Sequence, residues 1–251
     1  MKRLMVLTAG VVAGAVLVRR VAIPWWHTWG RRPEDDAPMP GDDLVADATA
    51  IETRGIDIAA PPEAVWPWLA QMGYGRAGWY SYDALDMNRP SSSDIDPSLA
   101  HVAVGDILPT HPGGGFEVRI AEPPDALVVF SDTELVRRQA EEAEADSEAA
   151  NPANIQATAA FLENAQPADF SASWAFVLQP RPDGTSRLIE RFRVRFGADD
   201  KPWLPATMPL MGFGVFLMMR KQMLGIRDRA ERAAEPARTG LLTKSPAGGG
   251  A

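Results

Sequence analysis

The sequence predicts an α+β fold, in which one curved antiparallel sheet packs against a long C-terminal helix. The first observation is a hairpin pattern, because residues 170–178 and 187–196 alternate their side chains on either side of a Pro-Asp-Gly turn. The second is an apolar helical stripe that begins near Pro205 and ends in the charged sequence RDRAER. The third is a series of strand-like segments joined by Gly- and Pro-rich loops, at residues 102–108, 116–121 and 126–131.

A further strand opens the folded part of the chain. Residues 49–59 become strand-like towards their end, where Ile56 and Ile58 share one face. Pro61 and Pro62 then end the strand and begin a helix. The predicted order is therefore a strand, helical structure, a series of hairpins and a final long helix.

Residues 61–86 hold the densest group of large rings in the chain. Their pattern predicts a short helix, a turn broken by glycines, and a second short helix that carries Trp79, Tyr80 and Tyr82. Such a cluster is either a plug of core or the rim of a cavity for an apolar ligand, and the composition leaves both readings open.

The central hairpin separates two kinds of side chain. Trp174 and Phe176 share one face of its first strand, and its second strand places Glu190 and Phe192 opposite a row of arginines. We expect the arginine face to be solvated. A carboxylate among apolar neighbours must be paired, hydrogen-bonded or protonated. Glu190 is therefore either in a salt bridge or exposed at the sheet's end, or it is a polar anchor or general acid/base in a cavity.

The N-terminal residues 1–26 are predicted to be a membrane anchor. An uncharged apolar run, residues 4–18, would form a helix about 22 Å long at about 1.5 Å per residue, which is shorter than the roughly 30 Å hydrocarbon core. Arg19 and Arg20 would snorkel to the interface. A cleaved signal peptide is the alternative, but no small-residue cleavage site follows the run. The arginines beyond the run favour a cytoplasmic domain, with secretion as the alternative.

Three other segments are predicted to lie outside the regular fold. Residues 27–48 are acidic and proline-dotted, which is typical of an extended linker. Residues 133–168 are rich in Ala and Glu and read as an acidic helical insertion. Residues 234–251 are predicted to be a disordered tail.

Composition argues against several classes of function. The net charge of -8 argues against nucleic-acid binding. The chain has no cysteine, and its histidines form no ligand-spaced pair, so we expect no metal. Gly73, Gly75 and Gly78 match G-x-G-x-x-G, but a helix precedes them and the neighbouring strands look antiparallel, so we read a tight turn and expect no cofactor.

Several segments together resemble the SRPBCC superfamily, which includes START domains, Bet v 1 allergens and polyketide cyclase-like proteins. The resemblance runs from Trp25 to about Arg232 and rests on IDIAAPPEAVWPWLAQMGYGRAGWYSYD, VGDILP, GGGFEVRIAEPPDALVV, SWAFVLQP, GTSRLIERFRVRF and RKQMLGIRDRAE. It implies a helix-grip domain over residues 49–233, with about seven strands around the C-terminal helix and two short helices after the first strand. The acidic insertion departs from the family pattern.

The resemblance also implies an apolar cavity between sheet and helix that holds a hydrophobic small molecule or lipid, for transport or for sensing. The alternative is a polyketide cyclase-like or hydrolytic enzyme that uses Glu190 as general acid/base. A third reading is a scaffold for protein contacts through the acidic insertion. The oligomeric state is left open. The residues expected at the cavity are Trp66, Trp68, Trp79, Tyr80, Tyr82, Trp174, Phe176, Glu190, Phe192, Met211, Val215 and Met218.

Overall fold

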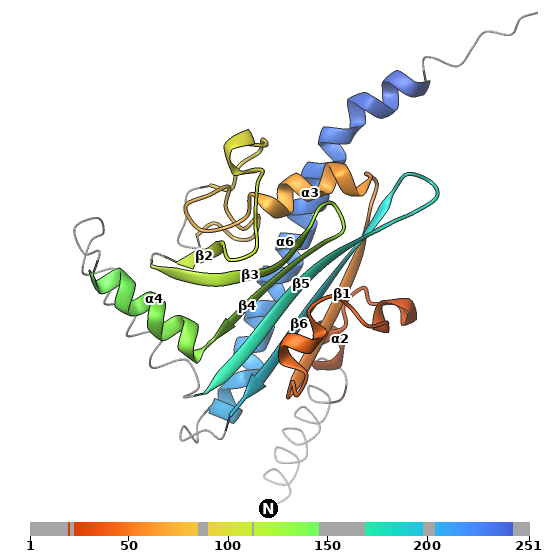
Figure 1. The fold of residues 1–251 in the computed structure, drawn as a ribbon. Helices are drawn as coiled ribbons and strands as arrows, with labels where there is room; N and C mark the ends of the chain where they lie inside the picture. The colour runs from red at the N-terminus through yellow and green to blue at the C-terminus, as the bar shows by residue number, and fades with distance from the viewer. Residues whose placement is uncertain are drawn as a thin grey trace, which may run out of the picture.

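The computed structural model describes residues 20, 23–84, 90–111, 113–145, 169–197 and 204–242. A curved six-stranded antiparallel sheet, in the order β1-β6-β5-β4-β3-β2, wraps one face around a long C-terminal helix (Figure 1). The strands are β1 (Ala50–Ile58), β2 (Ile107–His111), β3 (Gly114–Glu122), β4 (Ala126–Asp132), β5 (Phe170–Pro180) and β6 (Ser186–Phe196). The predicted antiparallel sheet and C-terminal helix are therefore confirmed.

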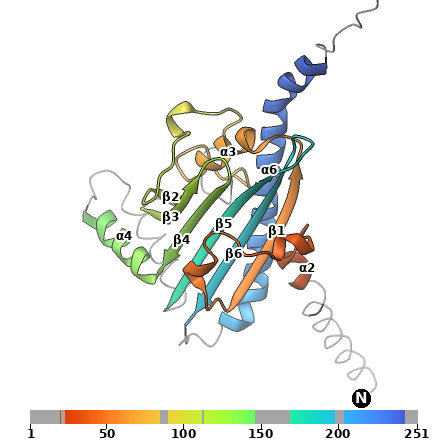
Figure 2. The ribbon, with the colours of Figure 1, turned by 45° about the vertical axis from the view of Figure 1, so that its right-hand side comes forward.

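Helices lie on both sides of the sheet. Helices α3 (Pro62–Ala70) and α6 (Leu204–Leu242) cover the concave face, which we call the inner face, and α4 (Thr133–Ala145) contacts β3 and β4 (Figure 2). Near the start of the described chain, α2 (Ile23–His27) contacts α6 and β1. The short 3-10 helices η2 (Pro33–Asp36) and η3 (Asp42–Val45) contact β1, β5 and β6 from the opposite face, the outer face, and η4 (Pro97–Leu99) lies in the loop before β2.

Strand register sets which residues enter the inner core. Trp174 is paired with Phe192, and Phe176 with Glu190, so these four side chains point to the same face of neighbouring strands. They belong with the side chains that α3 and α6 bury there. The sequence alternation in the central hairpin thus placed Glu190 correctly on the inner face.

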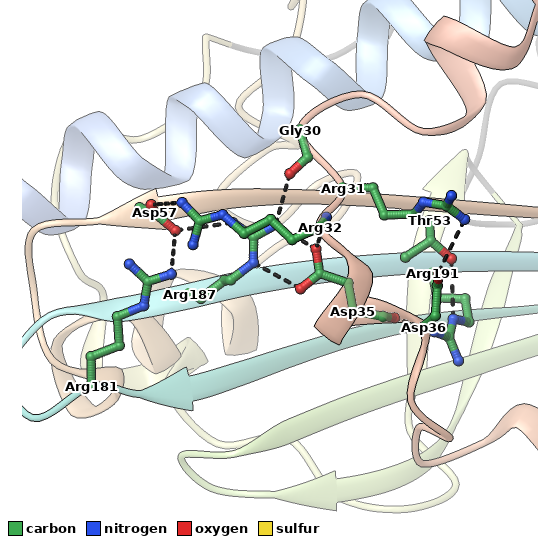
Figure 3. A network of polar contacts seen from close by, with 10 residues as sticks. All are labelled: Gly30, Arg31, Arg32, Asp35, Asp36, Thr53, Asp57, Arg181, Arg187 and Arg191. Atoms are coloured by element: carbon green, nitrogen blue, oxygen red, sulfur yellow. Dashed lines mark hydrogen bonds and ion pairs between the residues drawn. The ribbon is translucent and has the colours of Figure 1, made fainter.

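The arginines of β6 were expected to lie on a solvated face, but two of them, Arg187 and Arg191, are buried on the outer face. Arg187 is 2% exposed and Arg191 is 5% exposed, because residues 30–45 lie across them. Arg187 donates to both carboxylate oxygens of Asp35, with 2.8 Å from Nε to Oδ1 (Figure 3). Arg191 donates to Oδ2 of Asp42 at 2.7 Å. A small apolar cluster around Met39 and residues of β4, β5 and β6 completes this layer.

This layer also differs from the extended linker expected at residues 27–48. Three acidic residues of the segment pair with arginines of β6, so its charge is complementary to the sheet; they are Asp35, Asp42 and Asp47. Burial alone would raise the pKa of Asp35, but the hydrogen bonds from Arg187 and from the backbone of Arg32 outweigh it and hold the pKa below its usual value. Asp35 is thus charged near neutral pH and fixes the segment to the sheet.

Other expectations need correction. Over the described residues the sheet has six strands, where the resemblance implied about seven, and β2 begins only at Ile107, after a turn at residues 104–105. No second short helix occurs between residues 71 and 84, which form turns and one isolated bridge. A disordered tail was expected from residue 234, but α6 continues to Leu242.

The N-terminal run at residues 4–18 lies outside the described residues, as do residues 146–168 of the insertion and the last residues of the expected tail. Of the helices that are described, none is long and apolar enough to cross a membrane.

Candidate functional site

A cavity of about 320 Å³ lies between the inner face of the sheet and α6. Its walls come from the loop after α3, from β2, β3, β5 and β6, and from the N-terminal half of α6. The lining residues are Trp79, Ser81, Thr110, Phe116, Trp174, Phe192, Val215, Met218, Met219 and Gln222. Most of these side chains are apolar, and the exposed Val215 marks where the cavity reaches the surface.

Two stacked indoles form one wall. The rings of Trp79 and Trp174 lie 5.6 Å apart between centroids with an interplanar angle of 12°. Phe116 and Phe192 meet Trp174 edge-on, at 6.0 Å and 6.4 Å between centroids. The aromatic wall is therefore assembled from β3, β5, β6 and the loop after α3, and it fixes the shape of the cavity on the sheet side.

The loop that carries Trp79 is held in an unusual conformation at Tyr80. Tyr80 has φ of 57°, which is rare for a residue other than glycine. Its hydroxyl accepts a 2.9 Å hydrogen bond from Gln71, the guanidinium of Arg229 lies 4.6 Å from its ring centroid, and burial raises its pKa to about 12. Trp79 and Ser81, the residues on either side of Tyr80, both line the cavity, so this backbone turn positions two residues of its wall.

The glycines before this loop form the tight turn read from the sequence. Gly73, Gly75 and Gly78 all have positive φ, and Gly73 and Gly78 pair in an antiparallel bridge. The preceding element is helix α3, so the context of a dinucleotide-binding motif is absent from this part of the chain.

Glu190 lies behind the aromatic wall and does not line the cavity. Its side chain is fully buried, and its Oε1 accepts a 2.8 Å hydrogen bond from Nε1 of Trp174. Its Oε2 has no hydrogen-bond partner within the described chain. Burial raises the pKa of Glu190 to about 7, although the positive charge of Arg54 and the Trp174 hydrogen bond act in the opposite direction.

Arg54 is the charged neighbour of Glu190 on the adjacent strand. It is paired with Glu190 in the β1–β6 register and is fully buried. Its guanidinium donates to the Trp26 carbonyl at 3.0 Å, to Sδ of Met219 at 3.2 Å and to the carboxylate of Glu52. Arg54 is therefore held to the N-terminal segment and to α6.

The structure brings part of the predicted site together. Trp79, Trp174, Phe192, Val215 and Met218 all line the cavity. The side chain of Met211 lies outside the described residues. The remaining predicted residues are placed elsewhere: Trp66, Trp68, Tyr80 and Phe176 are buried in the inner core, Tyr82 is exposed, and Glu190 stands behind Trp174.

Sequence reasoning missed the polar part of the lining. Ser81, Thr110 and Gln222 are on the wall together with Phe116 and Met219. For Gln222 a signal existed, because it follows Val215 and Met218 at helical spacing on the apolar stripe of the C-terminal helix. Thr110 and Ser81 sit at the end of a short strand and in a loop, where no periodic pattern marks the buried face.

The comparisons with known proteins are distant. No family model matches the chain, and neither does any curated protein. One similar solved structure is protein MLL2253 from Mesorhizobium loti, with 17% identity and a TM-score of 0.34 over 73% of this chain and 98% of that one. Another is CalU16 from Micromonospora echinospora, with 13% identity and a TM-score of 0.26 over 74% of this chain and 85% of that one. Likenesses this weak carry no functional argument, so a function must be inferred from the cavity itself.

Proposed function

We propose that this protein is an SRPBCC-like, helix-grip protein that binds a small hydrophobic molecule in the cavity between its sheet and α6. The observation that carries the proposal is the cavity of about 320 Å³ with its wall of stacked tryptophans. Ligand pockets are typically concave, mostly apolar spaces of about 300 to 1,000 Å³ with a few polar groups. This cavity is at the small end of that range, which favours a compact ligand over a two-chain lipid.

The geometry favours binding over the alternative of catalysis by Glu190. A general acid/base must come within hydrogen-bond reach of the reacting atom, directly or through one water. The indole of Trp174 occupies that position between Glu190 and the cavity. Within the described chain, Trp174 is also the only side chain recorded in a hydrogen bond with Glu190. We therefore assign Glu190 to the support of the aromatic wall.

Isothermal titration calorimetry of the full chain with naphthalene tests the proposal, since naphthalene is a compact apolar probe. The expected result is saturable binding that Val215→Trp weakens about tenfold, because Val215 is 46% exposed at the opening and a larger ring would obstruct it. Leu217→Trp is the matched control, since Leu217 is 37% exposed on the same helix and does not line the cavity. Absence of saturable binding, or equal effects of the two substitutions, would contradict the proposal.

The N-terminal run at residues 4–18 completes the proposal as a membrane anchor that holds the domain near a lipid surface, on the cytoplasmic side. Its apolar composition and the flanking Arg19 and Arg20 support this assignment. Fractionation of cells that express the full chain or a variant lacking residues 1–20 tests it. We expect the full chain in the membrane fraction and the shortened chain outside it, and recovery of both in the same fraction would contradict the anchor.

A further inference from the structure

Two polar atoms near the cavity wall are left without partners. Gln222 is 2% exposed and its Nε2 contacts Sδ of Met72 at 3.6 Å, but its Oε1 has no hydrogen-bond partner in the described part of the chain. The buried hydroxyl of Ser81 is likewise without one there. Both residues line the cavity.

An unpartnered polar atom is costly in a buried, largely apolar place. Most buried polar groups in folded proteins are hydrogen-bonded. A buried group without a partner has lost its hydrogen bonds to water and gains none in return, which destabilises the folded state. Leu or Met would fit the stripe of α6 at position 222 without that cost. The glutamine is therefore better explained by a partner that arrives with the ligand than by packing.

The two side chains come from segments that contact each other, the loop after α3 and helix α6. A Cβ built on Gly225 would lie 2.4 Å from the carbonyl oxygen of Tyr80, so the backbone of α6 touches the loop there. Ser81 follows Tyr80 directly, and Gln222 precedes Gly225 by about one helical turn. Gln222 and Ser81 thus lie close in sequence to the same contact, and both line the cavity.

We infer that the ligand of this cavity carries a neutral hydroxyl group, which donates to Oε1 of Gln222 and accepts from the hydroxyl of Ser81. This inference rests on the proposed function and names the chemical class of its ligand. A hydroxyl is both donor and acceptor, so one group satisfies both unpartnered atoms.

The charges around the cavity disfavour an acidic ligand. Among the lining residues that the structure describes, none carries a formal charge. The nearby guanidinium of Arg54 already donates to Trp26, Met219 and Glu52. A carboxylate would enter without a cationic partner and lose its hydration, so a neutral head group is the better match.

Three matched probes test the inference by calorimetry on the full chain in lipid nanodiscs, with empty nanodiscs as the blank. They are naphthalene, 2-naphthol and 2-naphthoate, which share one ring system and differ in the head group. We expect 2-naphthol to bind about fivefold to tenfold more tightly than naphthalene, which corresponds to two neutral hydrogen bonds at the low end of their net contribution. The anion 2-naphthoate should bind more weakly than 2-naphthol.

Substitutions locate the head group. Gln222→Leu and Ser81→Ala should each reduce the ratio of 2-naphthol affinity to naphthalene affinity to about twofold or less. Thr110→Val is the control, because Thr110 is also polar and on the wall but has no unpartnered buried atom recorded. It should keep the preference.

The possible failures are distinguishable. If naphthalene and 2-naphthol bind the unaltered chain equally, or if both substitutions leave the preference intact, the hydroxyl inference is overturned and the proposed function stands. Tighter binding of 2-naphthoate, or loss of the preference only in Thr110→Val, also overturns it. If no probe binds, the proposed function fails, and this inference fails with it.

Discussion

Trp174 connects the buried carboxyl group of Glu190 to the cavity wall. Its Nε1 donates a 2.8 Å hydrogen bond to Oε1 of Glu190, and its ring stacks on Trp79 with 5.6 Å between the centroids. One indole therefore carries both a polar contact deep in the core and the apolar contact that shapes the cavity. The protonation of Glu190 and the position of this wall are physically linked.

The first prediction concerns the pH dependence of stability. Folding raises the pKa of Glu190 from 4.5 to about 7, so the folded state holds a proton that the unfolded state loses between these values. The stabilising effect is complete below about pH 4.5 and is lost as the pH rises through 7. At about 1.4 kcal/mol per pKa unit it amounts to about 3 kcal/mol.

Urea unfolding of wild type and Glu190→Gln between pH 4 and pH 8 measures this effect. The glutamine variant should lack this contribution. The unfolding free energy of wild type minus that of the variant should therefore fall as the pH rises from about 4.5 to 7 and stay constant above that range. Subtracting the two curves also removes the contribution of His27. Burial lowers the pKa of His27, so its effect makes stability rise with pH, opposite to the effect of Glu190. Parallel curves for the two proteins would contradict the prediction.

A second prediction tests the Trp174 hydrogen bond. Trp174→Phe removes a donor that lowers the pKa of Glu190, so that pKa should move above about 7 and the loss of stability should extend to higher pH. Phe192→Leu is the control, because Phe192 packs against Trp174 and lines the cavity without bonding to Glu190. It should lower stability by a similar amount at every pH. A pH shift in the control alone would refute the assignment.

The third prediction concerns the buried ion pair between Asp35 and Arg187 on the outer face. Asp35→Ala leaves the buried guanidinium of Arg187 without its bidentate partner and should cost about 3 kcal/mol or more of unfolding free energy. The double variant Asp35→Leu with Arg187→Met should recover most of that loss, because neither buried charge remains.

Urea unfolding near neutral pH measures the contribution of this ion pair to the unfolding free energy. Glu134→Ala is the control, because Glu134 forms an exposed ion pair with Arg137 whose loss should change stability little. The contribution of Asp35 should be present above pH 3.8 and disappear as the pH falls through its lower folded pKa. If the single and double variants were equally unstable, the ion pair would not be what holds the segment.

A fourth prediction compares two glycines of α6. A Cβ at Gly225 would lie 2.4 Å from the Tyr80 carbonyl oxygen, so Gly225→Ala should cost about 1 to 3 kcal/mol and displace the loop that carries Trp79. A Cβ at Gly214 meets nothing within 4 Å, so Gly214→Ala should stabilise the helix by up to about 1 kcal/mol. Thermal unfolding and near-ultraviolet circular dichroism of the tryptophans measure both. Equal stability of the two variants would show that α6 and the loop do not meet there.

Strand alternation predicted the inner face well, because side-chain direction in a strand follows from local periodicity. It placed Trp174, Glu190 and Phe192 together on the side that faces the helix. It could not place Glu190 behind an indole, since the depth of a side chain depends on the ring packed over it.

The outer face was misjudged because its partners are far apart in sequence. Arg187 and Asp35 meet across more than half of the chain, and neither segment alone shows that the other covers it. An acidic, proline-dotted stretch is typical of a linker when taken by itself. Opposite a row of arginines on an outer sheet face, the same composition makes a packed layer.

The attachment of Trp26 limits how far the folded domain can lie from the N-terminal residues. Trp26 is buried, and its carbonyl oxygen is bound by Arg54. From Arg20 to Trp26 the chain can span only about 20 Å even when fully extended. Arg20 therefore stays within about 20 Å of the folded domain, whereas a flexible 22-residue spacer would allow a much greater separation.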